Sequence, residues 1–448
     1  MKRKLFSHQR DAMEYAKSRD KIALFMEMLL GKTLVTIRWA ERQRGKKLVV
    51  LPLAVAEVWV EELSMEGLSS TLLIGSWQRR LEQYFESTDD WFITNYEYLL
   101  SDNCVARYVP WDVVILDESS KLRNARNKTT KAAIKYFQLV PRKAILSGLP
   151  NPESELDFFE QFRFLHGEFM GEDSYWRFRH QYYAQAGYEW RALAGVAKEI
   201  RDEVHDLAFI LDRVDAGMSN ERLTTTRHVT LPSSIRSVYD EAEDQLVLAM
   251  EETNLHIVRD NWLAQLTGGF FEKDDRAYCH SAKTDALVEL LEGELRGQPV
   301  IVWFRFNREL YGVESLLKER GIRCVAVTGR TKSTNKNLRL FRFKNRKVNV
   351  LLMQLKCGKY GLNLSVSSTA IYFGNSFSFE DRAQSVERIA HPSKIDALLT
   401  IDLVARGTID EDILRALRNK RIKSRAFTKV VIDSMRKRVA QRKKGKHK

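Results

Sequence analysis

The sequence predicts an α/β protein made of two units with parallel sheets, a helical insertion between them, and a basic C-terminal helix and tail. In residues 1–152 and again in 275–414, short apolar runs alternate with amphipathic helical patterns, which is typical of a parallel sheet covered by helices. Residues 153–274 instead give aromatic-rich helical patterns with few strand signals, and we expect their aromatic side chains to form a core. Residues 415–448 form the predicted basic segment.

Composition excludes several classes of protein. The 448 residues are 44% hydrophobic and 29% charged, which indicates a globular chain. No apolar run reaches the roughly 18 residues that a membrane helix needs, and the first residues lack the apolar stretch of a secretory signal. We therefore expect no membrane association and a cytoplasmic location.

The net charge of +14 lies at the C-terminus. Residues 415–448 contain fifteen Lys or Arg and one acidic residue, Asp433, so the rest of the chain is neutral overall. Such a concentration of positive charge favours contact with nucleic-acid phosphates. The simpler interpretation, a solvated tail that aids solubility, stays open from composition alone.

A phosphate-binding loop is predicted around Gly31-Lys32-Thr33. The apolar run Ile22–Phe25 predicts a strand, and a helical pattern begins after the loop. Free backbone N–H groups at the start of that helix favour a phosphate group. Lys32 would reach the outer phosphates of a nucleotide, and the Thr33 hydroxyl would ligate Mg²⁺.

Two carboxylates follow another predicted strand. Asp117 and Glu118 come directly after Val113–Leu116, and Ser147-Gly148 follows a further apolar run. The carboxyl ends of parallel strands meet at one edge of a sheet, so we expect all these residues near Gly31-Lys32-Thr33. Asp117 would hold Mg²⁺, and Glu118 would polarise the water that attacks the γ-phosphate. Taken singly, an Asp-Glu pair after a strand is more often a turn or a helix cap.

The second α/β unit has no phosphate loop of its own. Its predicted strands are followed by a helix over residues 381–389 that carries Gln384 and Arg388. Two such units imply two lobes with a cleft between them, in which the second lobe supplies positive charge to a nucleotide bound by the first.

The ordered set of motifs resembles superfamily-two helicases and translocases, most closely Swi/Snf-type DNA-dependent ATPases in a compact phage or bacterial form. The resemblance runs from about Leu5 to about Leu417 and implies two RecA-like lobes, ATP with Mg²⁺, and DNA as partner. It implies that Gln9 contacts adenine and that Arg388 faces the nucleotide. The other matching segments contain Gly31, Lys32 and Thr33, Thr94 and Asn95 (contacts to a DNA strand), Asp117, Glu118 and Lys121, Leu146 to Pro152, Gly361, and Gln384.

Departures from the family pattern fall around the ATP site. The family usually has glycine in place of Leu29, threonine in place of Leu149, and His-Arg in place of Ala390-His391. Leucine at position 29 places a side chain where the loop bends tightly. A histidine cannot supply the permanent, bidentate charge of an arginine finger. Hydrolysis is therefore expected to be weak.

Two functions follow from this reasoning. The first is a monomeric DNA-dependent ATPase that translocates on duplex or branched DNA, with Lys32, Asp117, Glu118 and Arg388 as its catalytic residues and Lys121 among its DNA contacts. The second is a nucleic-acid-binding scaffold that keeps the fold and has lost turnover. Deliberate alteration of an active parent would leave the same departures.

Overall fold

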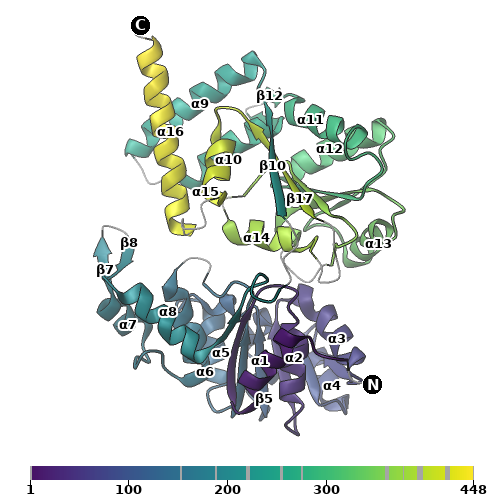
Figure 1. Ribbon diagram of the computed structural model, residues 1–448, viewed down its shortest axis with the longest axis vertical. Helices are drawn as coiled ribbons and strands as arrows, with labels where there is room; N and C mark the ends of the chain where they lie inside the picture. The colour runs from purple at the N-terminus through teal and green to yellow at the C-terminus, as the bar shows by residue number, and fades with distance from the viewer. Residues whose placement is uncertain are drawn as a thin grey trace. The chain divides into compact units, whose positions relative to one another are not determined.

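The structure, a computed structural model, describes residues 3–151, 154–186, 189–217, 222–252, 256–273, 276–358, 363–376, 378–390, 397–418 and 424–446. The chain forms two compact units, Met1–Ser219 and Asn220–Lys448. Both units have a wholly parallel main sheet with helices, which confirms the predicted two-unit α/β fold (Figure 1). The predicted insertion, residues 153–274, is shared between the two units.

The first unit contains a seven-stranded sheet in the order β3-β4-β2-β5-β6-β1-β9. Because β5, β6 and β1 are neighbours, the loops that follow them lie at one edge of the sheet. The strands are β1 (Lys21–Met26), β2 (Lys47–Leu51), β3 (Ser70–Leu72), β4 (Trp91–Asn95), β5 (Val113–Asp117), β6 (Arg142–Leu146) and β9 (Phe209–Leu211).

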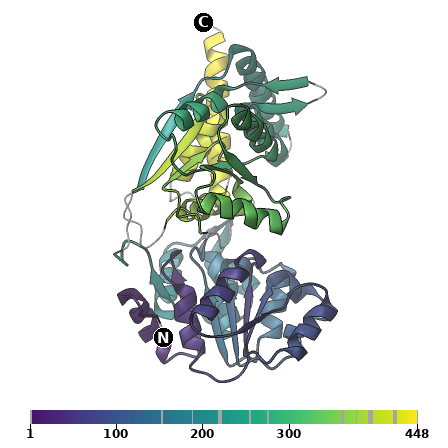
Figure 2. The same cartoon turned by 90° about the vertical axis from the view of Figure 1, so that its right-hand side faces the viewer.

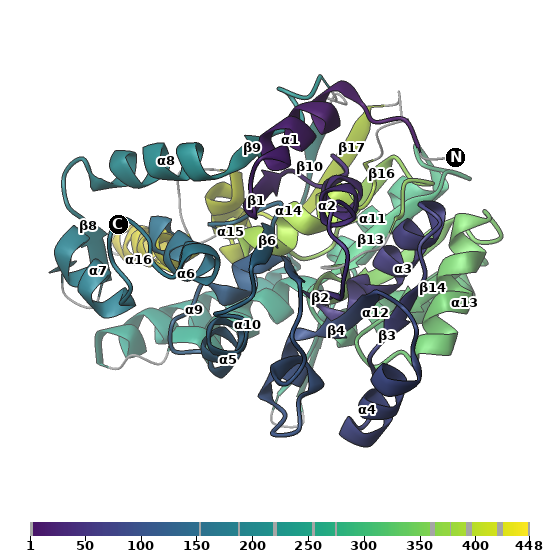
Figure 3. The same cartoon turned by 90° about the horizontal axis from the view of Figure 1, so that it is seen from below.

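Helices cover both faces of this sheet, as Figure 3 shows. Alternating side chains of β1 divide between two cores: Ile22 and Leu24 pack with α1, α2 and α3, whereas Ala23 and Phe25 pack with α5 and α6. The helices are α1 (Ser7–Lys17), α2 (Lys32–Ala40), α3 (Ala56–Met65), α4 (Trp77–Glu86), α5 (Lys128–Tyr136), α6 (Phe159–His166), α7 (Tyr175–Tyr182) and α8 (Val196–Leu207), with a hairpin of β7 (Tyr183–Ala186) and β8 (Glu189–Ala192).

The expectation of few strands in residues 153–274 was wrong in one respect. The segment supplies an edge strand to each main sheet: β9 pairs with β1, and β10 (Arg222–Val229) pairs with β17. Most of β10 is exposed and polar, so its sequence lacks the apolar pattern of a buried strand. Its aromatic residues do form a core, in which Phe159, Phe162 and Phe178 are fully buried.

The second unit contains a six-stranded sheet in the order β10-β17-β16-β13-β15-β14, with helices on both sides (Figure 2). Its further strands are β13 (Val300–Phe304), β14 (Cys324–Val327), β15 (Val350–Gln354), β16 (Thr369–Tyr372) and β17 (Leu398–Ala405), beside a hairpin of β11 (Phe270–Lys273) and β12 (Arg276–Cys279). Its helices are α9 (Ser233–Glu252), α10 (His256–Gly268), α11 (Ala282–Glu292), α12 (Asn307–Glu319), α13 (Ser333–Lys344), α14 (Phe379–Glu387), α15 (Ile409–Arg418) and α16 (Ser424–Lys446).

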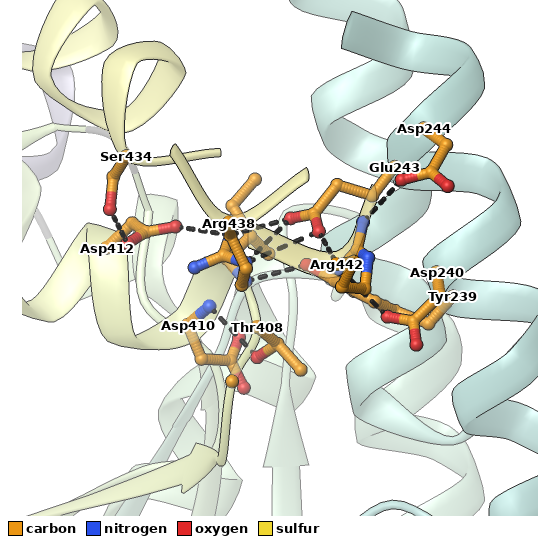
Figure 4. A network of polar contacts seen from close by, with 12 residues as sticks. Tyr239, Asp240, Glu243, Asp244, Thr408, Asp410, Asp412, Ser434, Arg438 and Arg442 are labelled. Atoms are coloured by element: carbon orange, nitrogen blue, oxygen red, sulfur yellow. Dashed lines mark hydrogen bonds and ion pairs between the residues drawn. The ribbon is translucent and has the colours of Figure 1, made fainter. Parts of the chain in front are cut away.

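The basic C-terminal segment is part of the second unit. Helix α16 packs on α9 and α15 through Val431, Met435 and Val439, which are nearly fully buried at intervals of four residues. Arg438 and Arg442 lie on the same helix and form ion pairs with acidic residues of α9 and α15 (Figure 4). Part of the positive charge predicted for nucleic acid is therefore balanced within the protein.

Two further features bear on the expected class of protein. None of the described helices is long and apolar enough to cross a membrane. All four cysteines are free thiols, of which Cys104 is buried and Cys279 exposed.

Candidate functional site

Three segments predicted to bind nucleotide meet at the carboxyl edge of the first sheet. The loop 27–31 follows β1, Ser147-Gly148 follows β6, and Asp117 ends β5. An ideal Cβ placed on Gly148 would lie 3.3 Å from Met28 Cγ and 3.7 Å from Lys32 Nζ. Glycine at position 148 thus allows the β6 loop to approach the β1 loop closely.

The β1 loop contains two residues in the left-handed region. Gly31 has φ of 80° and precedes α2, whose first residue is Lys32. Leu29 has φ of 68° and is partly exposed. A non-glycine residue in this conformation is strained by about 1 kcal/mol or more, so the departure at Leu29 coincides with backbone strain in the loop.

The N-terminal helix contacts this loop through two buried side chains. Gln9 Nε2 donates to the Leu30 carbonyl oxygen at 3.4 Å, and His8 Nε2 lies 3.1 Å from the same oxygen. Gln9 Oε1 accepts from the Phe6 N–H at 3.1 Å, which fixes the orientation of the amide. An ideal Cβ on Gly31 would lie 2.1 Å from Gln9 Nε2, so a side chain at position 31 would have to displace the Gln9 amide from its present place.

The Lys32 ammonium lies within the loop. It donates to the carbonyl oxygens of Met26 at 2.7 Å and Glu27 at 3.1 Å. The N–H groups at the start of α2 and this ammonium together give the positive character that phosphate binding requires. Thr33, next on α2, is half-buried.

Asp117 is buried at the end of β5 and held on both oxygens. Its Oδ2 accepts from Trp59 Nε1 at 2.8 Å, and its Oδ1 accepts from the Glu118 N–H at 2.9 Å. Tyr96 donates its hydroxyl to the Asp117 carbonyl oxygen at 2.9 Å. Burial raises the pKa of Asp117, and the hydrogen bond from Trp59 and the positive charge of Lys32 oppose that rise.

Glu118 adopts the left-handed conformation, with φ of 54°. The next residues, Ser119–Leu122, form a short 3-10 helix, so the chain turns sharply after β5 and leaves the Glu118 side chain half-buried. Lys121 in this short helix is exposed.

Thr94 and Asn95, which were predicted to contact a DNA strand, are covered by the side chain of an arginine. Arg80 Nη1 donates to Thr94 Oγ1 at 3.0 Å and to Asn95 Oδ1 at 3.1 Å, and Arg80 Nε donates to the Gly75 carbonyl oxygen at 3.0 Å. Thr94 is fully buried and Asn95 is 8% exposed. Burial lowers the pKa of Arg80.

Arg80 also stacks on Tyr98, with the guanidinium carbon 4.0 Å from the ring centroid. No carboxylate among the described residues pairs with it. Within the described part of the chain, its positive charge is therefore held by neutral groups and faces no balancing anion.

The second unit places Gln384 and Arg388 on and just after α14. Gln384 is 2% exposed, and its Oε1 has no hydrogen-bond partner in the described part of the chain. Arg388 is half-buried at the end of the helix. Gly361 and His391 lie outside the described residues, as does Pro152 of the segment that follows β6.

Two residues of the site had no assigned role in the sequence. The indole N–H of Trp59 in α3 orients Asp117. Arg80 lies in the amphipathic helix α4 next to Arg79, and the sequence gives no signal that Arg80 will cover Thr94 and Asn95. Both contacts join residues far apart in sequence, so only the packing of α3 and α4 reveals them.

Comparison with known protein families gives a match in each half of the chain. Residues 8–260 match the SNF2-related domain, and residues 282–393 match the helicase conserved C-terminal domain. Protein p41 of Acyrthosiphon pisum secondary endosymbiont phage 1 is 27% identical over 88% of this chain and 91% of its own length. The chromodomain-helicase-DNA-binding protein 1-like of Danio rerio is 24% identical over 86% of this chain, which spans only 40% of that protein.

A solved structure gives a further likeness. The Sulfolobus solfataricus SWI2/SNF2 ATPase core in complex with dsDNA aligns with 96% of this chain and 94% of its own, at 19% identity and a TM-score of 0.45. The SNF2-related match alone covers more than half of the 448 residues. This chain therefore belongs to the SNF2-related, Swi/Snf-type family of helicase-like ATPases.

Proposed function

We propose that this protein is a DNA-dependent ATPase that uses ATP hydrolysis to move along DNA. The observation that supports this most directly is the meeting of Lys32, Asp117 and Gly148 at one edge of the first sheet. A loop rich in N–H donors, a lysine and a buried carboxylate are the groups that phosphoryl transfer requires. ATP is the proposed substrate, with Gln9 beside the loop as the adenine contact.

The site fits a magnesium ion. The Asp117 carboxylate and the Thr33 hydroxyl offer the hard oxygen ligands that Mg²⁺ prefers, and among the described residues the carboxylate oxygens of Asp117 accept from the Trp59 indole and the Glu118 N–H rather than from a basic side chain. A bound Mg²⁺ would neutralise developing charge on the phosphates. Glu118 would accept a proton from the attacking water, and Lys32 would hold the outer phosphates in place.

For the second unit, the proposal keeps the roles that the resemblance implies. Gln384 and Arg388 would contact the nucleotide together with Gly361. A guanidinium near the transferred phosphoryl group contributes about 10³ to 10⁵ in rate, so Arg388 would have a large effect on turnover.

For DNA, we propose that Arg80 contacts a backbone phosphate, with Thr94 and Asn95 as its supports. A guanidinium that is held by neutral acceptors and faces no carboxylate is well suited to bind an anion. Lys121, exposed near the Asp117 site, would add a second phosphate contact. Contacts of this kind predict binding with little sequence preference and a steep dependence on salt.

Leu29 favours the alternative, a DNA-binding scaffold with weak or lost turnover. Its positive φ places a leucine where the loop requires a left-handed residue, and the family also has an arginine in place of His391. We prefer the enzyme because Lys32, Asp117 and Glu118 are all present at the sheet edge.

Phosphate release with and without duplex DNA tests the proposal. We expect DNA to stimulate release by the wild type, and Lys32→Ala to abolish it. Glu57→Gln, which changes an exposed carboxylate in the first turn of α3, is the matched control for Glu118→Gln and should leave the rate unchanged. If the wild type releases no phosphate, and Leu29→Gly with His391→Arg creates activity, the scaffold interpretation replaces the enzyme.

Duplex binding at increasing salt tests the phosphate contact separately. Arg80→Gln should weaken binding and reduce the slope of log K against log salt by about one. Arg42→Gln, a change at an exposed arginine whose guanidinium donates to the Lys17 carbonyl oxygen, serves as control. Equal slopes for the two variants would remove Arg80 from the proposed DNA surface.

A further inference from the structure

The first unit contains a stack of arginine and tryptophan side chains, here called the Arg–Trp ladder, that has no part in the proposed ATP site. Helix α7 and strand β8 (Figure 1) supply Trp176, Arg179 and Trp190, and the loop between β5 and α5 supplies Arg126. The guanidinium carbon of Arg179 lies 4.6 Å from the Trp176 ring centroid and 4.0 Å from that of Trp190. The guanidinium carbon of Arg126 lies 5.0 Å from the Trp176 centroid. The two indole rings therefore hold two cations in place.

Neither arginine of the ladder is balanced by an acid. Among the residues that the structure describes, no carboxylate pairs with Arg126 or Arg179, and Arg179 Nε is buried without a hydrogen-bond partner. By contrast, Arg177 on the same helix pairs with Glu172 at 3.1 Å and also with Asp173. Because buried donors nearly always have an acceptor, the ladder lacks a group that a bound anion would supply.

The surface around Arg126 is also basic. Residues 121–135 contain six Lys or Arg and no acidic residue, and Lys128 and Lys131 are exposed. Trp176 is 41% exposed and lies outside the aromatic core that other residues of the insertion form. An exposed positive surface without acids favours a polyanion over a mixed-charge protein surface.

The placement of the two arginines fits a chain of phosphates. Arg126 and Arg179 both lie over the ring of Trp176, so their guanidinium groups are close neighbours. Phosphates of one DNA strand recur about every 3.4 Å along the duplex axis, so two neighbouring guanidinium groups can contact two phosphates of one strand. Because the indole rings already stack on guanidinium groups, their role is to position the arginines, and unpaired bases are not required.

We propose that the Arg–Trp ladder is a second contact for the backbone of duplex DNA in the first unit. Arg126 and Arg179 donate to phosphate oxygens, and the two tryptophans orient the guanidinium groups before DNA binds. This preorganisation lowers the side-chain entropy that binding costs. The inference rests on the proposed DNA-dependent function, and it continues the contact assigned to Lys121 along the loop that follows β5.

Binding of a fluorescein-labelled duplex of about 30 base pairs to the full chain, measured by anisotropy at increasing salt, tests this proposal. We expect Arg126→Gln and Arg179→Gln each to reduce the slope of log K against log salt by about one. Arg177→Gln is the matched control on α7, and it should keep the wild-type slope because Arg177 is already paired with two carboxylates. Unchanged slopes in both ladder variants would overturn the proposal.

Trp176→Ala tests the ladder apart from its charge. It removes the ring and keeps both arginines, so duplex affinity should fall about threefold to tenfold, and Trp176→Phe should restore part of the loss. Affinity equal to that of the wild type would show that the ring does not position the arginines. Since Arg126 is an exposed loop residue, Arg126→Gln remains decisive even if Trp176→Ala lowers stability.

Failure of the ladder and failure of the proposed function give different results. A wild type that binds no duplex would overturn both. A wild type whose salt slope falls in Arg80→Gln but in neither ladder variant would overturn only the ladder. A labelled oligoglutamate that binds the wild type but not Arg126→Gln, with equal duplex affinity for both proteins, would assign the ladder to an acidic protein and overturn the proposal.

Discussion

Replacing Arg438 should release helix α16 from the second unit. Arg438 Nη2 lies 2.6 Å from Glu243 Oε1 of α9 and 2.6 Å from Asp412 Oδ2 of α15, so one guanidinium joins three helices (Figure 4). Both carboxylates are fully buried, and the arginine side chain is 16% exposed. The change Arg438→Met keeps much of the apolar stem and removes the charge.

The structure sets the size of the effect. Removing one partner of a buried ion pair costs about 3–5 kcal/mol, because it leaves a buried charge without compensation. After Arg438→Met, Glu243 keeps Arg442 at 2.7 Å, and Asp412 keeps Arg415 at 3.3 Å. We therefore expect the lower end of that range, about 3 kcal/mol, which is about a hundredfold in the opening equilibrium of α16.

Hydrogen exchange of the α16 amides measures this opening without requiring the two units to unfold together. Arg436→Met is the matched control on the same helix, since Arg436 is exposed and lies 3.9 Å from the exposed Asp433. Pairs of this kind contribute about 0–1 kcal/mol. Equal acceleration in Arg438→Met and Arg436→Met would refute the conclusion that the buried network holds the helix.

Three further predictions concern the interior of each unit. Leu29→Gly removes a leucine from φ of 68°, so it should stabilise the first unit by about 1 kcal/mol and raise ATP turnover. Urea melts measure the stability, and phosphate release measures the turnover. A variant that is less stable and slower than the wild type would contradict this prediction. Burial raises the pKa of Glu309 to about 7, so the folded state keeps a proton that the unfolded state loses above its ordinary pKa of 4.5. Stability should therefore fall by up to about 3 kcal/mol as pH rises from 4.5 to 7, and Glu309→Gln should flatten this part of the urea-midpoint profile; an unchanged profile would show that Glu309 is not its source. Trp59→Phe removes the N–H that lies 2.8 Å from Asp117 Oδ2 and should lower turnover about tenfold and alter its Mg²⁺ dependence, whereas an unchanged Mg²⁺ titration would mean that Trp59 only fills space.

The apolar strands could be predicted because a strand that is buried on both faces requires apolar residues at nearly every position of its sequence. Runs such as Val113–Asp117 and Val300–Phe304 are buried at every position, and parallel strands covered on both faces require that composition. Strand β10 escaped prediction because it is an exposed edge strand with three consecutive threonines. Its place in the sheet comes from parallel pairing with β17, whose residues lie more than 170 positions further along the sequence.

The site could be predicted only as far as strand ends determine it. The order β5-β6-β1 brings Asp117, Gly148 and the Lys32 loop to one edge, as expected from their positions at the ends of predicted parallel strands. The position of Arg80 over Thr94 and Asn95 depends on how α4 packs, which no local pattern encodes. Counting basic residues likewise could not distinguish Arg438, which pairs with buried carboxylates, from the neighbouring Lys437, which is exposed.

The most direct test of the proposed ATPase measures ATP binding and phosphate release on the same samples of wild type and Glu118→Gln, with duplex DNA present. Glu118 is assigned to the attacking water and Lys32 to the phosphates, so the two activities should separate. We predict that both proteins bind ATP and that only the wild type releases phosphate at a DNA-stimulated rate. Equal release by the two proteins, or no ATP binding by either, would contradict the assignment of this sheet edge as the catalytic site.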